Sequence, residues 1–134
     1  MKAIDTNVLV RVLTRDDAAQ AAVAVAEIRD GPIYLTATVL LETEWVLRHA
    51  YQFDREQVGR ALLATVSLDG ATIDDEAAVR VALRRHAAGM DFADALHLAR
   101  VEKADEFITF DMHFARVAAE AGAKPPVRLL KAET

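Results

Sequence analysis

The sequence predicts a single α/β domain over residues 1–134, with a parallel central sheet of four or five short strands flanked by helices on both faces. Short apolar runs of strand length alternate with longer segments of helical periodicity. Hydrophobic residues make up 53% of the 134 residues and charged residues 28%, a balance that suits one compact core. No repeat, linker or low-complexity tract divides the chain.

The first half of the chain is expected to contain two strands, each followed by two helices. In chain order these are a strand at 2–5, helices at 7–13 and 16–29, a strand at 33–36, and helices at 39–51 and 55–66. Asp16 or Asp17 caps the second helix and Asp54 caps the fourth, because Asp accepts hydrogen bonds from the first free N–H groups of a helix. Gly31 and Pro32 break the chain before the second strand.

The second half continues the alternation. Its expected elements are a strand at 71–73, helices at 74–89 and 91–103, a strand at 106–109, a helix at 112–121 and a strand at 127–130. Asp74 or Asp75 starts the first of these helices, and Gly122 ends the last. Strands that alternate with helices form parallel sheets, whose ligands bind beyond the carboxyl ends of the strands.

Composition excludes several classes of protein. The chain has no cysteine, so disulfides, zinc–thiolate sites and thiol catalysis are excluded. Its first residues reach a charge too early for a signal peptide, and no apolar run approaches the roughly 20 residues that span a bilayer. We expect a soluble, cytoplasmic protein without a membrane partner.

The net charge of −5 argues against a general RNA-coating protein. It does not argue against a metal-dependent nuclease, since two bound divalent ions would bring the net charge from −5 to −1.

Acidic residues follow two of the expected strands. Asp5 ends the first strand, and Asp111 comes shortly after the strand at 106–109. Thr6, Asn7 and Thr109 add polar side chains beside them. Each Asp is also well suited to cap the helix that follows, which is the more common role for an Asp at such a position.

Two further acids belong to helices. Glu42 lies near the start of the helix at 39–51, where an anion is favoured, although an isolated Glu there is usually a solvated side chain. Glu44 lies on another face and is expected to be an ordinary solvated Glu. Asp91, Asp94 and His97 share one side of the helix at 91–103.

The surroundings of Asp94 favour a metal ligand. Its helix is otherwise largely apolar, and a carboxylate among apolar neighbours must be paired, protonated or bound to a metal. Asp91 suits a cap and a metal contact equally. Oxygen ligands without cysteine or paired histidines suit Mg²⁺ or Mn²⁺ rather than zinc, and Mg²⁺ held by carboxylates is typical of phosphodiester chemistry.

Four motifs together resemble the PIN-domain family, and within it the VapC-like toxins of bacterial toxin–antitoxin pairs. They are residues 4–11, 40–47, 91–99 and 109–111, and the resemblance covers almost the whole chain. It implies a metal-dependent endoribonuclease that cleaves RNA, in translation-machinery RNAs such as tRNA or rRNA. It also implies a homodimer silenced by a VapB-like antitoxin.

By this resemblance the catalytic acids are Asp5, Glu42, Asp94 and Asp111. They would bind Mg²⁺ or Mn²⁺, with Asp91 as an additional acid nearby. Candidate RNA contacts are Arg11, Arg48 and Arg100, although any one of them is more often a solvated or salt-bridged surface residue. His97 is more often structural than a phosphate contact.

Two other functions fit parts of the sequence. A phosphatase would use Asp5 as its nucleophile, but Lys103 and Lys124 are poorly placed to meet the phosphoryl group because neither follows a strand end. A non-catalytic module would bind RNA or protein through the same fold, and degenerate acids would be its signature. Trp45, Tyr51 and Phe53 suit either the core or an oligomer interface.

Overall fold

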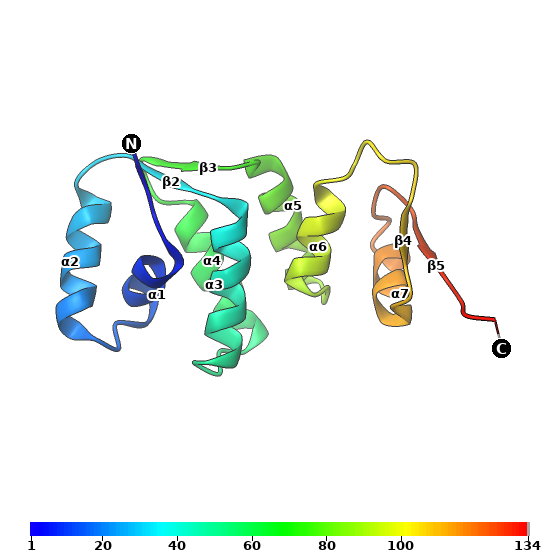
Figure 1. The fold of residues 1–134 in the computed structure, drawn as a ribbon, viewed down its shortest axis with the longest axis horizontal. Coiled ribbons are helices and arrows are strands. Elements are labelled where there is room, and N and C mark those ends of the chain that lie inside the picture. The colour runs from blue at the N-terminus through cyan, green and yellow to red at the C-terminus, as the bar shows by residue number, and fades with distance from the viewer. Residues whose placement is uncertain (134) are drawn as a thin grey trace. The chain divides into compact units, whose positions relative to one another are not determined.

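The computed structural model describes residues 1–133 and has an α/β fold, as the sequence predicts (Figure 1). The chain forms two compact units, Met1–Glu76 and Ala77–Thr134. Five short strands occur in the described residues, and all their pairings are parallel. They form a three-stranded and a two-stranded sheet, where the sequence predicts one central sheet. No helix in residues 1–133 is long and apolar enough to cross a membrane.

The three-stranded sheet belongs to the first unit, in the order β1-β2-β3. Its strands are β1 (Lys2–Ala3), β2 (Ile33–Leu35) and β3 (Ala71–Ile73). Lys2 pairs with Ile33, and Ile33 pairs with Ala71. Ile33 and Leu35 are completely covered, because β2 is the central strand.

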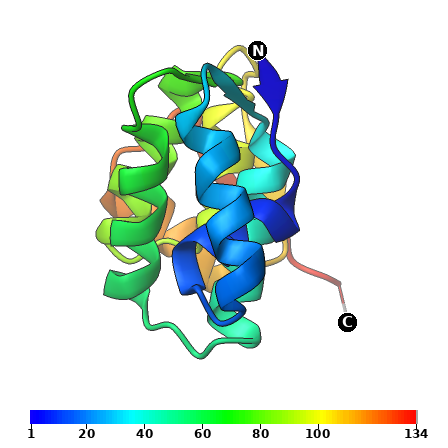
Figure 2. The same ribbon diagram turned by 90° about the vertical axis from the view of Figure 1, so that its left-hand side faces the viewer.

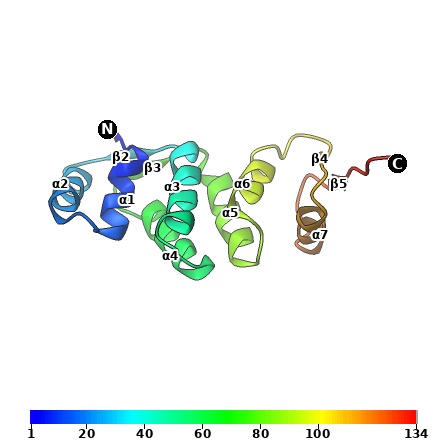
Figure 3. The same ribbon diagram turned by 60° about the horizontal axis from the view of Figure 1, so that its bottom comes forward.

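Two helices connect each pair of strands in the first unit. These helices are α1 (Thr6–Thr14), α2 (Ala18–Arg29), α3 (Ala37–His49) and α4 (Arg55–Val66). Helix α1 packs against both α2 and α3, with α2 on the far side of α1 from α3, and α3 also packs against α4 (Figures 1 and 3). Figure 2 looks on this unit from the α2 side. The contact of α1 with α3 brings the first two sequence motifs side by side.

Side-chain caps determine where these helices begin. Asp17 accepts a hydrogen bond from Gln20 N at 3.0 Å, and Asp54 forms a capping box with Gln57. Thr36 accepts a hydrogen bond from Val39 N at 3.2 Å. The third helix therefore begins at Ala37, two residues before its predicted start, because Thr36 supplies a cap that the apolar pattern does not reveal.

The second unit contains α5 (Glu76–Ala87, of which Glu76 belongs to the first unit), α6 (Phe92–Ala99), β4 (Phe107–Thr109), α7 (Met112–Glu120) and β5 (Val127–Leu129). The rings of His86 and Phe92 meet edge to face between α5 and α6, and those of Phe107 and Phe114 between β4 and α7. The predicted helix end at residue 103 is wrong. The helix stops at Ala99, and residues 101–106 are all exposed, so no apolar contact supports further turns.

Candidate metal centre

Asp5 lies where the first strand passes into the first helix. Ile4 N still donates to Tyr34 O at 3.2 Å, so the sheet pairing continues to the residue before Asp5. Asp5 then caps α1, accepting from Thr6 N at 2.8 Å through Oδ1. Its side chain is exposed, and Oδ2 has no hydrogen bond within residues 1–133. Asp5 is thus both a helix cap and a carboxylate with one oxygen available.

Thr6 connects the first motif to the second. Its side chain is buried, at 7% exposure, and its hydroxyl donates a hydrogen bond to Glu42 Oε1. Glu42 itself is exposed and lies in the second turn of α3. The hydrogen bond therefore holds a carboxylate from α3 beside the start of α1, although 36 residues separate the two.

Asp5 and Glu42 share a pocket between α1 and α3. The pocket has a volume of about 480 Å³. Its lining residues are Asp5, Thr6, Asn7, Val10, Arg11, Glu42, Val46, Ala50 and Tyr51. The expected supporting residues Thr6 and Asn7 thus line the same cavity as two of the predicted catalytic acids.

The second unit carries the other three acids. Asp91 caps α6, accepting from Asp94 N at 3.1 Å. Asp111 caps α7, accepting from Phe114 N at 3.0 Å. Thr109 supports this second cap, because its hydroxyl accepts a hydrogen bond from Asp111 N at 3.0 Å. The capping roles considered from the sequence for Asp91 and Asp111 are therefore present.

Asp94 has the most perturbed surroundings of these acids. Burial raises the pKa of its carboxyl above the ordinary value, and the charges of Asp91 and Asp111 raise it further. Among the described residues, no hydrogen bond to the Asp94 carboxylate offsets these effects; His97 and His113 offer only a smaller opposing attraction. A half-buried carboxylate that is subject to the charge of two others would be stabilised by a cation.

The predicted acids belong to different units, Asp5 and Glu42 to the first and Asp91, Asp94 and Asp111 to the second. Within residues 1–133, no three Asp, Glu, His or Cys side chains are arranged to hold a metal ion. Within the first unit Asp5 and Glu42 line one pocket, and within the second the charges of Asp91 and Asp111 act on Asp94. All their side-chain donors are oxygens, which suit Mg²⁺ or Mn²⁺.

Glu44 corrects one expectation from the sequence. It is buried, at 3% exposure, rather than solvated. Its carboxylate accepts from Arg48 Nε at 2.7 Å and from Arg48 Nη2 at 3.2 Å. Burial became possible because Arg48, one turn later on α3, supplies a fork of donors that matches the carboxylate.

The three candidate RNA-binding arginines differ in their surroundings. Arg48 pairs with Glu44, and the exposed Arg100 forms the C-cap of α6. Arg11 belongs to a polar network with Asp16 and Tyr51. Sequence reasoning gave Tyr51 no role in the site, and no local pattern could have, because Tyr51 lies 40 residues from Arg11.

The sequence matches one known protein family. The PIN-domain profile matches residues 2–120, which include all four motifs and extend over both units. The chain belongs to the PIN-domain family. PIN domains are a family of metal-dependent nucleases, which typically use divalent ions such as Mg²⁺. A search of curated proteins gave no significant match.

Proposed function

We propose that this PIN domain is an endoribonuclease that hydrolyses RNA phosphodiester bonds with Mg²⁺ or Mn²⁺. The observation that carries the proposal is the environment of Asp94, which is half-buried and lies beside the charges of Asp91 and Asp111. Such an arrangement is unfavourable without a cation and becomes favourable with one. Asp91 and Asp111 cap helices α6 and α7, but this capping does not require Asp94 as a third acid near them.

Four acids would hold the metal, namely Asp5, Glu42, Asp94 and Asp111, with Asp91 as an additional neighbour. In this proposal the two units act as one catalytic domain over residues 1–134. A bound divalent ion supplies a water of lowered pKa and neutralises charge on the scissile phosphate. The products would carry 5′-phosphate and 3′-hydroxyl ends.

The residues around the acids would hold them in place. Thr6 donates to Glu42, and Thr109 accepts from the backbone N–H of Asp111. Asn7 lines the pocket beside Asp5. Such supporting groups matter because a metal ligand must keep its orientation through the reaction.

The sequence motifs support a more specific role. Residues 4–11, 40–47, 91–99 and 109–111 resemble VapC-like toxins, so we propose that the protein is the toxin of a VapBC-type pair. Its substrates would be tRNA or rRNA, and its inhibitor a cognate VapB-like antitoxin. It would work in the cytoplasm as a homodimer, for which the exposed Trp45 on α3 is a candidate contact.

An RNA-cleavage assay tests the nuclease. Total tRNA is incubated with the wild type, Asp5→Asn and Asp69→Asn, in Mg²⁺, Mn²⁺ or EDTA. Asp69 is the matched control, because it is an exposed acid of the first unit outside the pocket. We expect metal-dependent cleavage by the wild type and Asp69→Asn, and its loss in Asp5→Asn.

Equal cleavage by Asp5→Asn would contradict the assignment of the site. If the protein binds RNA but neither cleaves it nor binds a metal ion, the non-catalytic module is favoured. A covalent aspartyl-phosphate on Asp5, without RNA cleavage, would favour the phosphatase.

A further inference from the structure

The pocket that contains Asp5 and Glu42 continues past the acids to Arg11 and Tyr51. Thr6 and Glu42 meet near the start of α1, whereas Arg11 and Tyr51 meet near its end. Arg11 lies six positions after Asp5, and a helix rises about 1.5 Å per residue, so about 9 Å separates them along α1. An extended RNA strand that places one phosphate at the acids would bring a neighbouring phosphate near Arg11.

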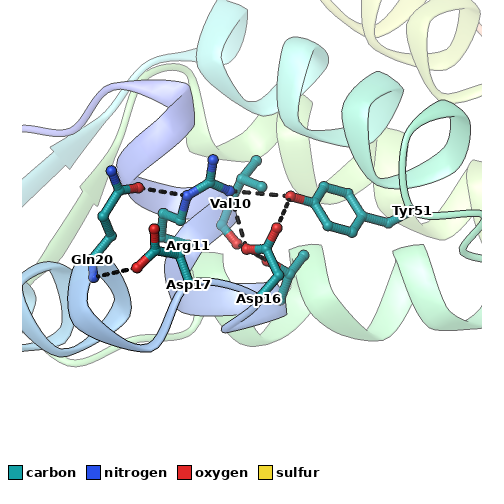
Figure 4. Close-up of polar contacts among 7 residues, drawn as sticks. Val10, Arg11, Asp16, Asp17, Gln20 and Tyr51 are labelled. Carbon is teal, nitrogen blue, oxygen red and sulfur yellow. Dashed lines mark hydrogen bonds and ion pairs between the residues drawn. The ribbon is translucent and has the colours of Figure 1, made fainter.

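Arg11 is held on two sides (Figure 4). Its Nε donates to Gln20 Oε1 at 2.7 Å. Its Nη1 donates to Asp16 Oδ1 at 3.2 Å and to the Tyr51 hydroxyl at 3.1 Å. Tyr51 in turn donates to Asp16 Oδ2 at 2.6 Å, so the three side chains form a closed ring of hydrogen bonds.

This network leaves one nitrogen of the guanidinium, Nη2, without a hydrogen bond within residues 1–133, although Nε and Nη1 are both used. Arg11 is half-buried and lines the pocket. Its pKa is raised chiefly by the Tyr51 hydrogen bond, so it stays charged at any physiological pH.

The positive charge of Arg11 suits an anionic ligand such as phosphate. Arg11 is the single Lys or Arg among the pocket's lining residues, which otherwise include the carboxylates of Asp5 and Glu42. An RNA strand carries one negative charge per nucleotide, and Arg11 Nη2 can donate a charge-assisted hydrogen bond to a phosphate oxygen. Asp16 offsets part of the positive charge of Arg11. This end of the pocket therefore suits contact with a single phosphate rather than with several.

We propose that Arg11 binds the RNA phosphate next to the scissile one, and that Tyr51, Asp16 and Gln20 are positioning residues that fix its guanidinium. The subsite rests on the proposed ribonuclease function. It takes any RNA sequence, because it contacts the backbone rather than a base. It gives the strand a path through the pocket, from the acids towards Arg11 and Tyr51.

RNA binding at several salt concentrations tests the subsite separately from cleavage. A fluorescein-labelled, single-stranded RNA of mixed sequence is titrated in Mg²⁺ with Asp94→Asn, which prevents turnover, and with Asp94→Asn carrying Arg11→Gln. Losing one phosphate contact should weaken binding about tenfold and reduce the slope of log K against log salt by about 0.7. Arg15→Gln is the matched control, because Arg15 is exposed and lies outside the pocket.

Two further variants separate a phosphate contact from a structural role. Arg11→Lys loses most of the hydrogen-bond network but keeps the positive charge. Because the salt slope depends on that charge, it should be retained. Tyr51→Phe keeps Arg11 but removes its hydroxyl partner, and should weaken binding about threefold with the slope unchanged. A merely structural role would affect Lys and Gln at position 11 alike, and thermal unfolding of each variant shows whether it is folded.

The outcomes distinguish this inference from the ribonuclease function. An unchanged slope in Arg11→Gln, or absence of RNA binding, overturns the subsite. Cleavage by the wild type with an unchanged slope refutes the subsite alone. The expected slope change without any wild-type cleavage supports an RNA phosphate contact at Arg11, but contradicts the nuclease and with it the place of that contact beside a scissile phosphate.

Discussion

Replacing Thr6 with Val tests whether the Thr6–Glu42 hydrogen bond supports the site. Val has nearly the same shape as Thr and a similar helix propensity, so it fits the buried position while removing the hydroxyl. The Glu42 carboxylate then loses its donor from α1. We expect Thr6→Val to fold, to be slightly less stable and to bind metal weakly.

The magnitudes follow from the burial of the two partners. A hydrogen bond to a charged group contributes about 1.5–3 kcal/mol, and because Glu42 is exposed to water we expect a loss of about 1 kcal/mol. This corresponds to a decrease in Tm of about 4 °C for a chain of this size. Loss of a group that orients a metal ligand usually costs about ten- to a hundredfold in metal affinity or activity.

Thr65→Val is the control for Thr6→Val. Thr65 is also buried, and its hydroxyl donates to Ala61 O at 2.8 Å, away from the pocket. Both variants should lose similar stability in urea unfolding, but Thr6→Val alone should need more Mg²⁺ for half-maximal RNA cleavage. A Thr6→Val enzyme with the wild-type Mg²⁺ dependence would refute this reasoning.

Three other variants test local electrostatics. Asp94→Asn should raise the Tm in EDTA, most clearly at neutral pH. The pKa of Asp94 is raised in the folded state, so its charged form destabilises the fold as pH rises. An unchanged or lower Tm would contradict the described surroundings of Asp94. Arg48→Ala should cost about 2–3 kcal/mol in urea unfolding, since it leaves the buried Glu44 carboxylate without this partner, and a cost near zero would count against that burial. Asp16 has a lowered pKa, owing first to the Tyr51 hydrogen bond, so its contribution is present above about pH 4 and is lost as the solution becomes more acidic. The Tm difference between wild type and Asp16→Asn should therefore shrink below that pH; a constant difference would speak against the network.

Much of the fold could be predicted from local signals. Asp54 and Gln57 form the capping box that starts α4 at its predicted first residue, and the strand at Ala71–Ile73 has its predicted bounds. These elements depend on neighbours in sequence. The division of the strands into two sheets depends on pairing between distant segments, which periodicity does not encode.

The candidate site could be predicted in part for the same reason. The caps formed by Asp5, Asp91 and Asp111 follow from residue type at the start of a helix. The burial of Glu44 and the contact of Tyr51 with Arg11 do not, because each depends on tertiary packing around a residue that looks ordinary in sequence.

Calorimetric titration with Mn²⁺ tests most directly whether the two acidic groups serve one metal centre. The wild type, Asp5→Asn, Asp94→Asn and the double variant are compared, with Asp69→Asn as the control. If Asp5 and Asp94 bind the same ion, each single variant should lose most of the affinity and the double variant little more. Independent losses that add in the double variant, or wild-type affinity in Asp5→Asn, would contradict a shared centre.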